Sequence, residues 1–268
     1  MLIPSLINPP RILDLDEDTS LTSAIAAMGR RALLLDWGSA KERASLSVAG
    51  HIEQLLLPLV EQIGEEAALV GYCLGGTMAI AAANFVRCEC VVTLAAPWHF
   101  SRYPAASREA LQDMWAHSKS PAQSLGALPM EVLQAAFWSL DPARTVAKFA
   151  EFGRLPPDSA EAHRFVELED WANEGEPLPY AAARELIEDM FGHDLPGTGR
   201  WLVCGRPARG EPDAPLLNIL AAHDRIAPAA TAPPGPSAAI ATGHVGMVVG
   251  SARSELHARL KDFLAPCR

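Results

Sequence analysis

Residues 70–77, with the sequence VGYCLGGT, decide the fold expected for this chain. An apolar run leads into a Gly-X-Cys-X-Gly turn, and small residues with a helical pattern follow it. Such a strand, turn and helix form the nucleophile-elbow pattern, here with Cys73 in place of serine. The turn is so tight that side chains two positions before and after the nucleophile would clash, and Gly71 and Gly75 remove them. A helix that begins directly after Cys73 also favours its thiolate, the form that attacks.

The motif alone leaves two other interpretations open. One is a glycine-rich turn around a buried thiol, and the other is a phosphate-binding loop that lacks its lysine. The uncharged segment 67–86 around the motif is also long enough to span a bilayer. Its glycines cluster in the middle, as a turn requires, so a buried strand, turn and helix are expected instead of a transmembrane helix.

Short apolar segments alternate with helical patterns along the chain, which predicts an α/β fold with a mostly parallel sheet and helices on both faces. The predicted strands are residues 2–7, 32–36, 68–72, 90–95, 216–221 and 238–241. The helices predicted between and after these strands are residues 16–28, 45–63, 77–86 and 254–264.

The region from residue 97 to about residue 199 differs, because it has helical patterns and no convincing strand. It holds four of the six tryptophans. Its predicted helices are residues 107–117, 130–140, 143–152, 160–172 and 179–191. We therefore predict three parts, namely a first core part at 1–97, an inserted helical cap at 98–199 and a second core part at 200–268.

Two further residues complete a catalytic pattern in the chain order nucleophile, acid, histidine. Asp224 follows the predicted strand 216–221, where a carboxylate that orients an imidazole belongs, and His244 follows the last predicted strand. His244 is the expected general base, with its other nitrogen held by Asp224. Taken singly, Asp224 is more typical of a helix N-cap and His244 of a hydrogen-bonded loop histidine. Their order and their positions at strand ends favour a Cys73–His244–Asp224 triad.

The composition excludes several classes of protein. With 49% hydrophobic residues and five cysteines in 268 residues, the chain is neither disordered nor a disulfide-stapled miniprotein. A formal net charge of −10 argues against nucleic acid as a partner and requires a locally basic pocket for any anionic ligand. The first residues do not resemble a signal peptide, so a cytoplasmic location with reduced thiols is expected. Cys88 and Cys90 have no accompanying motif at zinc spacing, so no metal site is predicted.

Several motifs together make the sequence similar to the polyhydroxyalkanoate (poly-3-hydroxybutyrate) synthases of the α/β-hydrolase superfamily. The matches run through nearly the whole chain and include PSLIN at 4–8, ILDL at 12–15, LDWG at 35–38, GYCLGG at 71–76, FVELEDW at 165–171 and GHVG at 243–246. The resemblance implies an α/β-hydrolase fold and assigns the triad to Cys73, His244 and Asp224. It also implies an oxyanion hole made of the backbone N–H groups of Leu74 and Ile7.

The activity that the resemblance implies is acyl transfer from 3-hydroxyacyl-CoA thioesters into a polyester, through a covalent thioester on Cys73. Exchange of one thioester for another keeps the acyl group activated for attack by a hydroxyl, which ester formation in a polymer requires. The helical cap would then exclude water from this intermediate. No cofactor is implied, because hydroxyacyl-CoA is the substrate. The implied partners are this acyl substrate, a polyester granule and a second copy of the chain in a homodimer.

The sequence departs from the family at its N-terminus. Members usually carry a substantial stretch before the PSLIN loop, tied to assembly and granule binding, whereas this sequence begins at Met1, close to the loop. Either the gene starts upstream of Met1 or the protein has dispensed with that stretch. Two other functions stay open: a thioesterase or esterase of the same fold with water as the acceptor, and an inactive paralogue that binds a synthase or a polymer granule. The acyl chain length, the oligomeric state and the residues that bind the CoA phosphates are not predicted.

Overall fold

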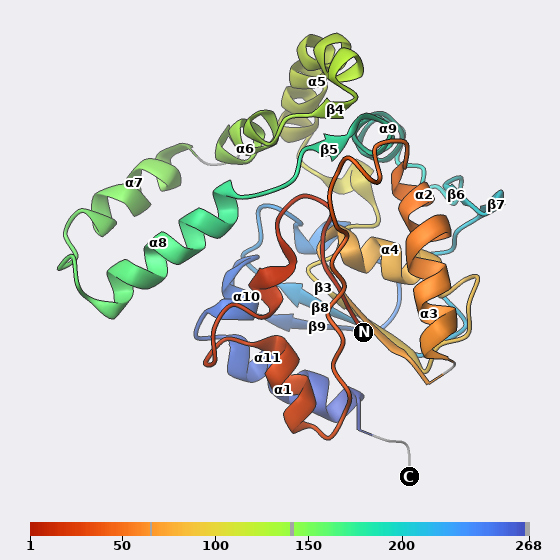
Figure 1. Cartoon of the computed structure of the whole chain (residues 1–268), viewed down its shortest axis with the longest axis horizontal. Coiled ribbons are helices and arrows are strands. Elements are labelled where there is room, and N and C mark those ends of the chain that lie inside the picture. The colour runs from red at the N-terminus through yellow and green to blue at the C-terminus, as the bar shows by residue number, and fades with distance from the viewer. Residues whose placement is uncertain (65, 140–141, 266–268) are drawn as a thin grey trace.

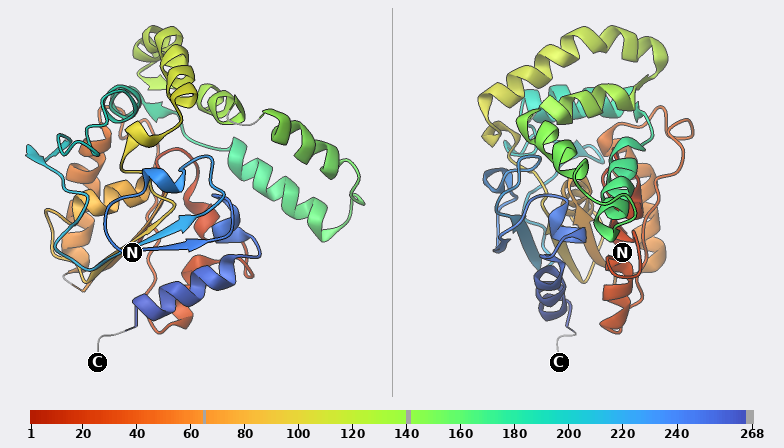
Figure 2. Two further views of the ribbon diagram at one scale, coloured as in Figure 1. Left: turned by 180° about the vertical axis from the view of Figure 1, so that it is seen from behind. Right: turned by 90° about the vertical axis from the view of Figure 1, so that its left-hand side faces the viewer.

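The computed structural model describes residues 1–64, 66–139 and 142–265 of the chain. Within these residues, the central sheet has five parallel strands in the order β1-β2-β3-β8-β9 (Figures 1 and 2). The strands are β1 Leu2–Ile3, β2 Ala68–Tyr72, β3 Cys90–Leu94, β8 Leu216–Ala221 and β9 Ser237–Ile240. Because they are parallel, their carboxyl ends lie along one edge of the sheet, where ligand sites of such folds are built. The predicted α/β class with a parallel sheet is confirmed.

Helices cover both faces of this sheet. One face packs against α2 (Val48–His51), η2 (Ile52–Leu56), α3 (Leu57–Ile63) and α4 (Leu74–Ala82). The other face packs against η1 (Pro10–Leu13), α1 (Leu21–Ala27), α10 (Gly246–Val249) and α11 (Arg253–Phe263). Leu69 belongs to the first buried cluster and its neighbour Val70 to the second, because side chains alternate along a strand. Burial on both faces explains why the strands are apolar almost throughout.

The predicted strand ends differ from the structure at the side of the sheet formed by β1. The segment 2–7 keeps strand geometry only at Leu2–Ile3, since Pro4 has no N–H to donate to a ladder. The segment 32–36 is reduced to a single parallel bridge between Leu34 and Leu2. Its partner strand β1 is too short to support a longer ladder.

The segment 67–86 forms β2, a turn, the whole of α4 and the turn after it, so the predicted strand, turn and helix are present. The helix begins at Leu74 and ends at Ala82, earlier at both ends than the predicted range 77–86. Its charge-free character therefore reflects burial inside a globular fold, because every residue of α4 is buried. No helix in the described part of the chain is long and apolar enough to cross a membrane.

The chain between β3 and β8 is mainly helical. Its longer helices are α5 (Ala105–Leu125), α6 (Met130–Ser139), α7 (Pro142–Phe152), α8 (Ala160–Asn173) and α9 (Tyr180–Arg184), which continues into η4 (Glu185–Gly192). The short elements here and in the later loops are η3 Phe100–Arg102, β4 Ala127–Leu128, β5 Leu178–Pro179, β6 Leu202–Val203, β7 Arg206–Pro207 and η5 Ala229–Thr231. The antiparallel pairs β4–β5 and β6–β7 were not predicted, because two residues are too few to produce a recognisable alternation. The helix predicted at 107–117 is also longer in the structure, where α5 continues past Pro121.

Helices α7 and α8 extend from the rest of the molecule as an arm, residues 142–173 (Figures 1 and 2). Lys148 on α7 and Glu169 on α8 join the two helices by an ion pair of 2.6 Å. The division into a core and a cap at 98–199 stays a prediction.

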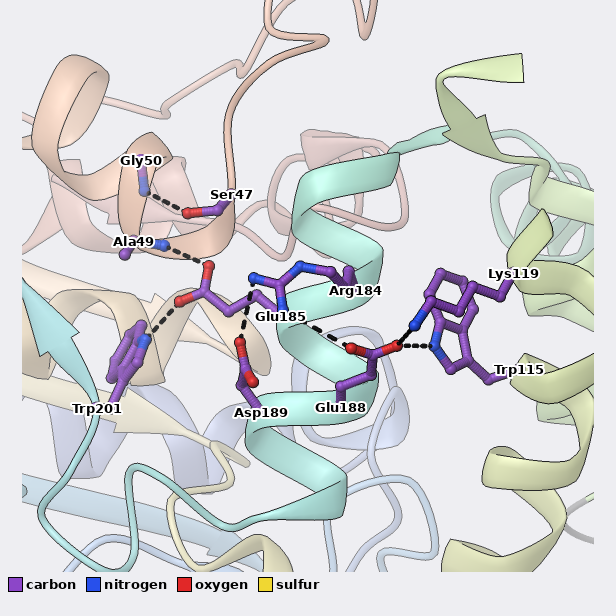
Figure 3. Close-up of polar contacts among 10 residues, drawn as sticks. All are labelled: Ser47, Ala49, Gly50, Trp115, Lys119, Arg184, Glu185, Glu188, Asp189 and Trp201. Atoms are coloured by element: carbon purple, nitrogen blue, oxygen red, sulfur yellow. Dashed lines mark hydrogen bonds and ion pairs between the residues drawn. The ribbon is translucent and has the colours of Figure 1, made fainter. Parts of the chain in front are cut away.

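Two carboxylates of η4, near the base of the arm, connect this helix to its neighbours (Figure 3). Glu185 is buried and accepts hydrogen bonds from the N–H of Ala49, at 3.1 Å, and from Nε1 of Trp201, at 2.6 Å. Glu188 in turn accepts from Nε1 of Trp115 at 2.8 Å. These contacts connect η4 to α2 on one side and to α5 on the other.

Candidate active site

The elbow holds Cys73 in a backbone conformation that is rare for residues other than glycine. Cys73 lies between β2 and α4 with φ of 56° and ψ of −130°. Its N–H donates to the carbonyl oxygen of Leu94 on the neighbouring strand at 2.9 Å. A Cβ atom on Gly71 would lie 2.4 Å from the carbonyl oxygen of Gly75, and one on Gly75 would lie 2.1 Å from that of Ile3. Both glycines are therefore required by the close approach of backbone segments that the sequence pattern predicted.

His244 and Asp224 meet at the same edge of the sheet. Asp224 follows β8 and His244 follows β9, and Nδ1 of His244 donates to Oδ2 of Asp224 at 2.6 Å. The second carboxylate oxygen accepts from the N–H groups of Ile226, at 2.8 Å, and Ala227, at 2.9 Å. Both oxygens of the buried Asp224 are thus satisfied, and the imidazole is held in one orientation.

The structure brings Cys73 to the other side of the same imidazole. Both side chains line the same cleft, and Cys73 is close enough to act on the pKa of His244. Burial alone lowers the pKa of His244, but the interactions with Cys73 and Asp224 outweigh it and raise the pKa to about 10. The imidazole is therefore protonated at neutral pH whenever Cys73 is a thiolate. The arrangement can deliver a proton to a leaving group and take one from an incoming nucleophile.

Tyr72 is a site residue that the sequence did not single out. Its ring centre lies 5.0 Å from that of His244, and its hydroxyl donates to the carbonyl oxygen of His244 at 3.3 Å. Burial, together with the charges of Cys73 and Asp224, raises the pKa of Tyr72 well above its usual value, so the phenol stays neutral. The position before the nucleophile in the elbow motif is the only signal in the sequence that could have found it.

The two expected oxyanion donors differ in their surroundings. Leu74 is the first residue of α4, where the N–H has no partner within the helix and points out of its N-terminus. The N–H of Ile7 instead donates to Oγ of Ser5 at 3.4 Å, a long and weak hydrogen bond. Ile7 does line the same cleft as Cys73. Ser5 was not predicted as a site residue, although it belongs to the PSLIN motif.

A cleft of about 720 Å³ surrounds these groups. The sheet edge forms one wall, and the helices α6, α7 and α8 form the other, with Gln134, Trp138, Lys148, Arg164, Phe165 and Leu168. Glu169 also lines this cleft, with only 18% of its side chain exposed. Its partner Lys148 is remote in sequence on another helix, so no local pattern could have indicated the pair. A second cavity of about 560 Å³, between α5 and η4, contains none of the predicted site residues.

Cys88 and Cys90, which the sequence analysis considered as metal ligands, do not line this cleft. Burial raises the pKa of Cys88 to about 11 and that of Cys90 to about 12, so both thiols stay protonated at neutral pH. Glu89 between them pairs with Arg30 at 2.5 Å. In the described part of the chain, no group of three or more His, Cys, Asp or Glu side chains could hold a metal ion.

Comparison with known proteins agrees with the resemblance seen in the motifs. The chain is 23% identical to the poly(3-hydroxyalkanoate) polymerase subunit PhaC of Haloferax mediterranei, over 99% of this chain and 58% of that protein. It is 22% identical to PhaC of Haloarcula marismortui, over 94% of this chain and 57% of that protein. For PhaC of Allochromatium vinosum the identity is 24%, over 98% of this chain and 79% of that protein. The chain thus spans less than two thirds of the length of its two haloarchaeal relatives. No protein-family model matches it.

Solved structures identify the fold. A hydrolase from Pseudomonas aeruginosa PA01 superimposes with a TM-score of 0.56 and 15% identity, covering 98% of this chain and 88% of that one. MGS-M2, an alpha/beta hydrolase from a deep-sea metagenome, gives a TM-score of 0.51 with 11% identity, covering 100% of this chain and 89% of that one. The chain therefore has an α/β-hydrolase fold, and in sequence it is similar to polyhydroxyalkanoate synthases over nearly its whole length.

Proposed function

We propose that this chain is an acyltransferase of the polyhydroxyalkanoate synthase type, which takes 3-hydroxyacyl groups from CoA thioesters through a thioester on Cys73. The observation that carries the proposal is a cysteine at the elbow that shares a cleft with a histidine held by a buried carboxylate. The similarity to PhaC proteins along nearly the whole chain supports the choice of substrate.

In the first half of the reaction, the Cys73 thiolate attacks the thioester carbonyl carbon. The negative charge that develops on the carbonyl oxygen is stabilised by the N–H groups of Leu74 and Ile7, once the latter is released from Ser5. When the tetrahedral intermediate collapses, the bond to the CoA sulfur breaks and His244 protonates the departing thiolate. One thioester replaces another, so the step costs little free energy.

In the second half, a hydroxyl group of the acceptor attacks the thioester on Cys73. His244 removes the proton from this hydroxyl, an ester bond forms, and Cys73 leaves as a thiolate. Asp224 holds the imidazole in the tautomer and orientation that both steps need. The Cys73 thiolate is a better leaving group than the alkoxide that a serine would release. A cysteine nucleophile therefore suits a reaction that ends in an ester.

The charges of the cleft support an anionic substrate. The chain carries a net charge of −10, yet three cationic side chains line this cleft, namely Lys148, Arg164 and Arg225. The acidic residues Glu169 and Asp224 also line it, and Lys148 pairs with Glu169, so the lysine and arginine side chains exceed the carboxylates by one. The cleft is thus a locally basic part of an acidic protein, suited to the phosphates of CoA.

A thioesterase with water as the acceptor is the second candidate. The wall formed by α7 and α8 includes polar and charged side chains, and Trp138 beside them is 46% exposed. Water that reaches His244 through this wall would hydrolyse the thioester on Cys73 by the same steps.

Incubation of the purified chain with 3-hydroxybutyryl-CoA separates these functions. The expected result is CoA release, followed with a thiol reagent, together with turbidity from insoluble polymer. CoA release with free 3-hydroxybutyrate would instead support the thioesterase, and no release would contradict both. Mass spectrometry of the intact protein would detect an acyl adduct, and mass spectrometry of its peptides would show whether the adduct is on Cys73.

A further inference from the structure

The loop that carries Ile7 has little secondary structure of its own. It extends over residues 4–9 between β1 and η1, and it has no ladder hydrogen bonds beyond Ile3. From the core side, Nε1 of Trp37 donates to the carbonyl oxygen of Pro4 at 3.1 Å, and Gly75 packs against the same backbone. These contacts hold the beginning of the loop, whereas Ile7 lies further along the chain.

The second half of the loop is held by a segment from the helical region. This segment, residues 171–176, leads out of α8 toward β5, and we refer to it as the strap. Nε1 of the buried Trp171 donates to the carbonyl oxygen of Pro9 at 2.9 Å. The side-chain amide of Asn8 donates to the carbonyl oxygen of Ala172 at 3.3 Å.

The strap also contacts Ile7 itself. A Cβ atom on Gly175 would lie 2.8 Å from the carbonyl oxygen of Ile7, closer than real Cβ contacts allow. Glu174 and Glu176 anchor the strap on both sides of this point, to Arg11 at 2.8 Å and to the N–H of Ala40 at 3.0 Å. The strap is therefore held to the core chiefly by Trp171 and Glu176, with an exposed ion pair from Glu174 to Arg11, and its glycine lies against the carbonyl group of Ile7.

From these contacts we propose that Trp171 and Gly175 are positioning residues for the oxyanion hole, which place the N–H of Ile7 against the carbonyl oxygen of the acyl substrate. This inference rests on the proposed function, because it assumes that an acyl group reacts at Cys73. Trp171 lines the cleft, and in this proposal both residues act through their contacts with the loop backbone. An oxyanion donor is effective only when its geometry is fixed in advance, and a displacement of about 1 Å at an active site can cost on the order of 100-fold in rate. The helical region would thus complete the hole that the core begins with Leu74.

Two single substitutions test this role. Trp171→Phe keeps an aromatic ring and deletes the N–H that holds Pro9. Gly175→Ala introduces the Cβ that pushes against Ile7. Each has a matched control elsewhere. Trp201→Phe deletes the N–H of another buried indole, which is bound to Glu185 (Figure 3), and Gly153→Ala adds a Cβ whose nearest neighbour is an ordinary 3.6 Å away.

The measurement compares two reactions of Cys73 in all five proteins. Acylation by p-nitrophenyl acetate passes through a tetrahedral oxyanion, whereas alkylation by iodoacetamide is a direct displacement of iodide by the thiolate and needs no oxyanion hole. We expect acylation to fall by about 10- to 100-fold in Trp171→Phe and Gly175→Ala, with alkylation within twofold of the unsubstituted chain. Both controls should retain both rates, even where their thermal stability falls.

Equal acylation rates in all variants would overturn the inference. So would a parallel loss of acylation and alkylation, because the strap would then act on Cys73 or His244 and not on the hole. Failure of the proposed function is a separate result, namely no CoA release from 3-hydroxybutyryl-CoA by the unsubstituted chain. The comparison with p-nitrophenyl acetate would still decide the role of the strap in that case.

Discussion

Two charge pairs face the same cleft from opposite walls, and the distance between the partners is the same in both. His244 and Asp224 on the sheet edge are 2.6 Å apart, as are Lys148 and Glu169 on the arm. The side chains of the first pair are 7% and 0% exposed, whereas those of the second are 35% and 18% exposed. Water screens the second pair much more than the first, so the second can break and reform more easily. Burial, and not distance, therefore separates the fixed pair on the sheet edge from the adaptable pair on the arm.

The supports of the two walls explain this difference. Cys73, Asp224 and His244 each follow a strand of the sheet, and the strands are locked in register by pairs such as Ala221 with Ile240. The arm is hydrogen-bonded to the core loop at Trp171 and Ala172, whereas its outer part leaves Val146, 70% exposed, and Val166, 44% exposed, on its surface. Chemistry is therefore expected from the sheet wall, and the shape of the cleft from the arm wall.

The largest expected effect is that of Cys73→Ala, which removes the nucleophile from the sheet wall. CoA release from 3-hydroxybutyryl-CoA should fall by at least about 10⁴-fold, because no covalent intermediate can form. Circular dichroism should show an unchanged fold. The control is Cys204→Ser, which alters an exposed thiol outside the cleft and should leave the rate unchanged. Full turnover by Cys73→Ala would show that the triad assignment is wrong.

Asp224→Asn should lower the rate of CoA release by about 10³-fold. The amide fills the same space but presents either an N–H or a neutral oxygen to Nδ1, so the imidazole loses the tautomer it needs. The exposed carboxylate of Asp213, which pairs with Arg209, provides the control Asp213→Asn. A loss of less than tenfold in Asp224→Asn would mean that the buried pair is no more important than the exposed one.

Gly75→Ala tests the rigidity of the sheet wall through stability. The added Cβ would lie 2.1 Å from the carbonyl oxygen of Ile3 and 2.6 Å from that of Pro4, and both neighbours are backbone atoms that cannot rotate away. We expect the free energy of unfolding to fall by about 3 kcal/mol in chemical denaturation. Gly153→Ala, on the turn of the arm, should change it by less than about 0.5 kcal/mol. Similar values for the two variants would contradict the contrast between the walls.

A smaller effect is expected for the pKa of His244, on the same wall, when Cys73 is replaced. Its pKa of about 10 lies above that of an unfolded histidine, so the stability contributed by the protonated ring is fully present below pH 6.5 and is lost as the pH rises through about 10. In nitrogen NMR of the imidazole, the midpoint should fall well below 10 in Cys73→Ala, since the variant removes a negative charge. An unchanged midpoint would show that Asp224 alone sustains the raised pKa.

The contrast between the walls also explains what the sequence could predict. Local sterics dictate the residues of the elbow, Gly71, Cys73 and Gly75, which are close in sequence, so their spacing predicted the elbow. The chain order of Asp224 and His244 then predicted the rest of the triad. The apolar strands were recognisable because both faces of the sheet are buried. Other contacts could not be predicted, because no sequence periodicity encodes them. Two depend on how separate segments meet, namely Lys148 with Glu169 and Trp171 with Pro9. The contact of Ser5 with Ile7 depends on the rotation of a side chain.

Glu169→Gln is expected to have the smallest effect of all. The substitution removes the charge that attracts Lys148 but keeps a group that can accept a hydrogen bond, and the lysine is exposed enough to be hydrated instead. The free energy of unfolding should therefore change by about 0.5 kcal/mol or less, and 0.5 M salt should reduce this difference further because it screens the original pair. Chemical denaturation at low and high salt measures both quantities. A salt-independent loss above about 2 kcal/mol would mean that the arm pair is as well shielded from water as His244 and Asp224, and the arm wall would then have to be regarded as a fixed part of the catalytic site.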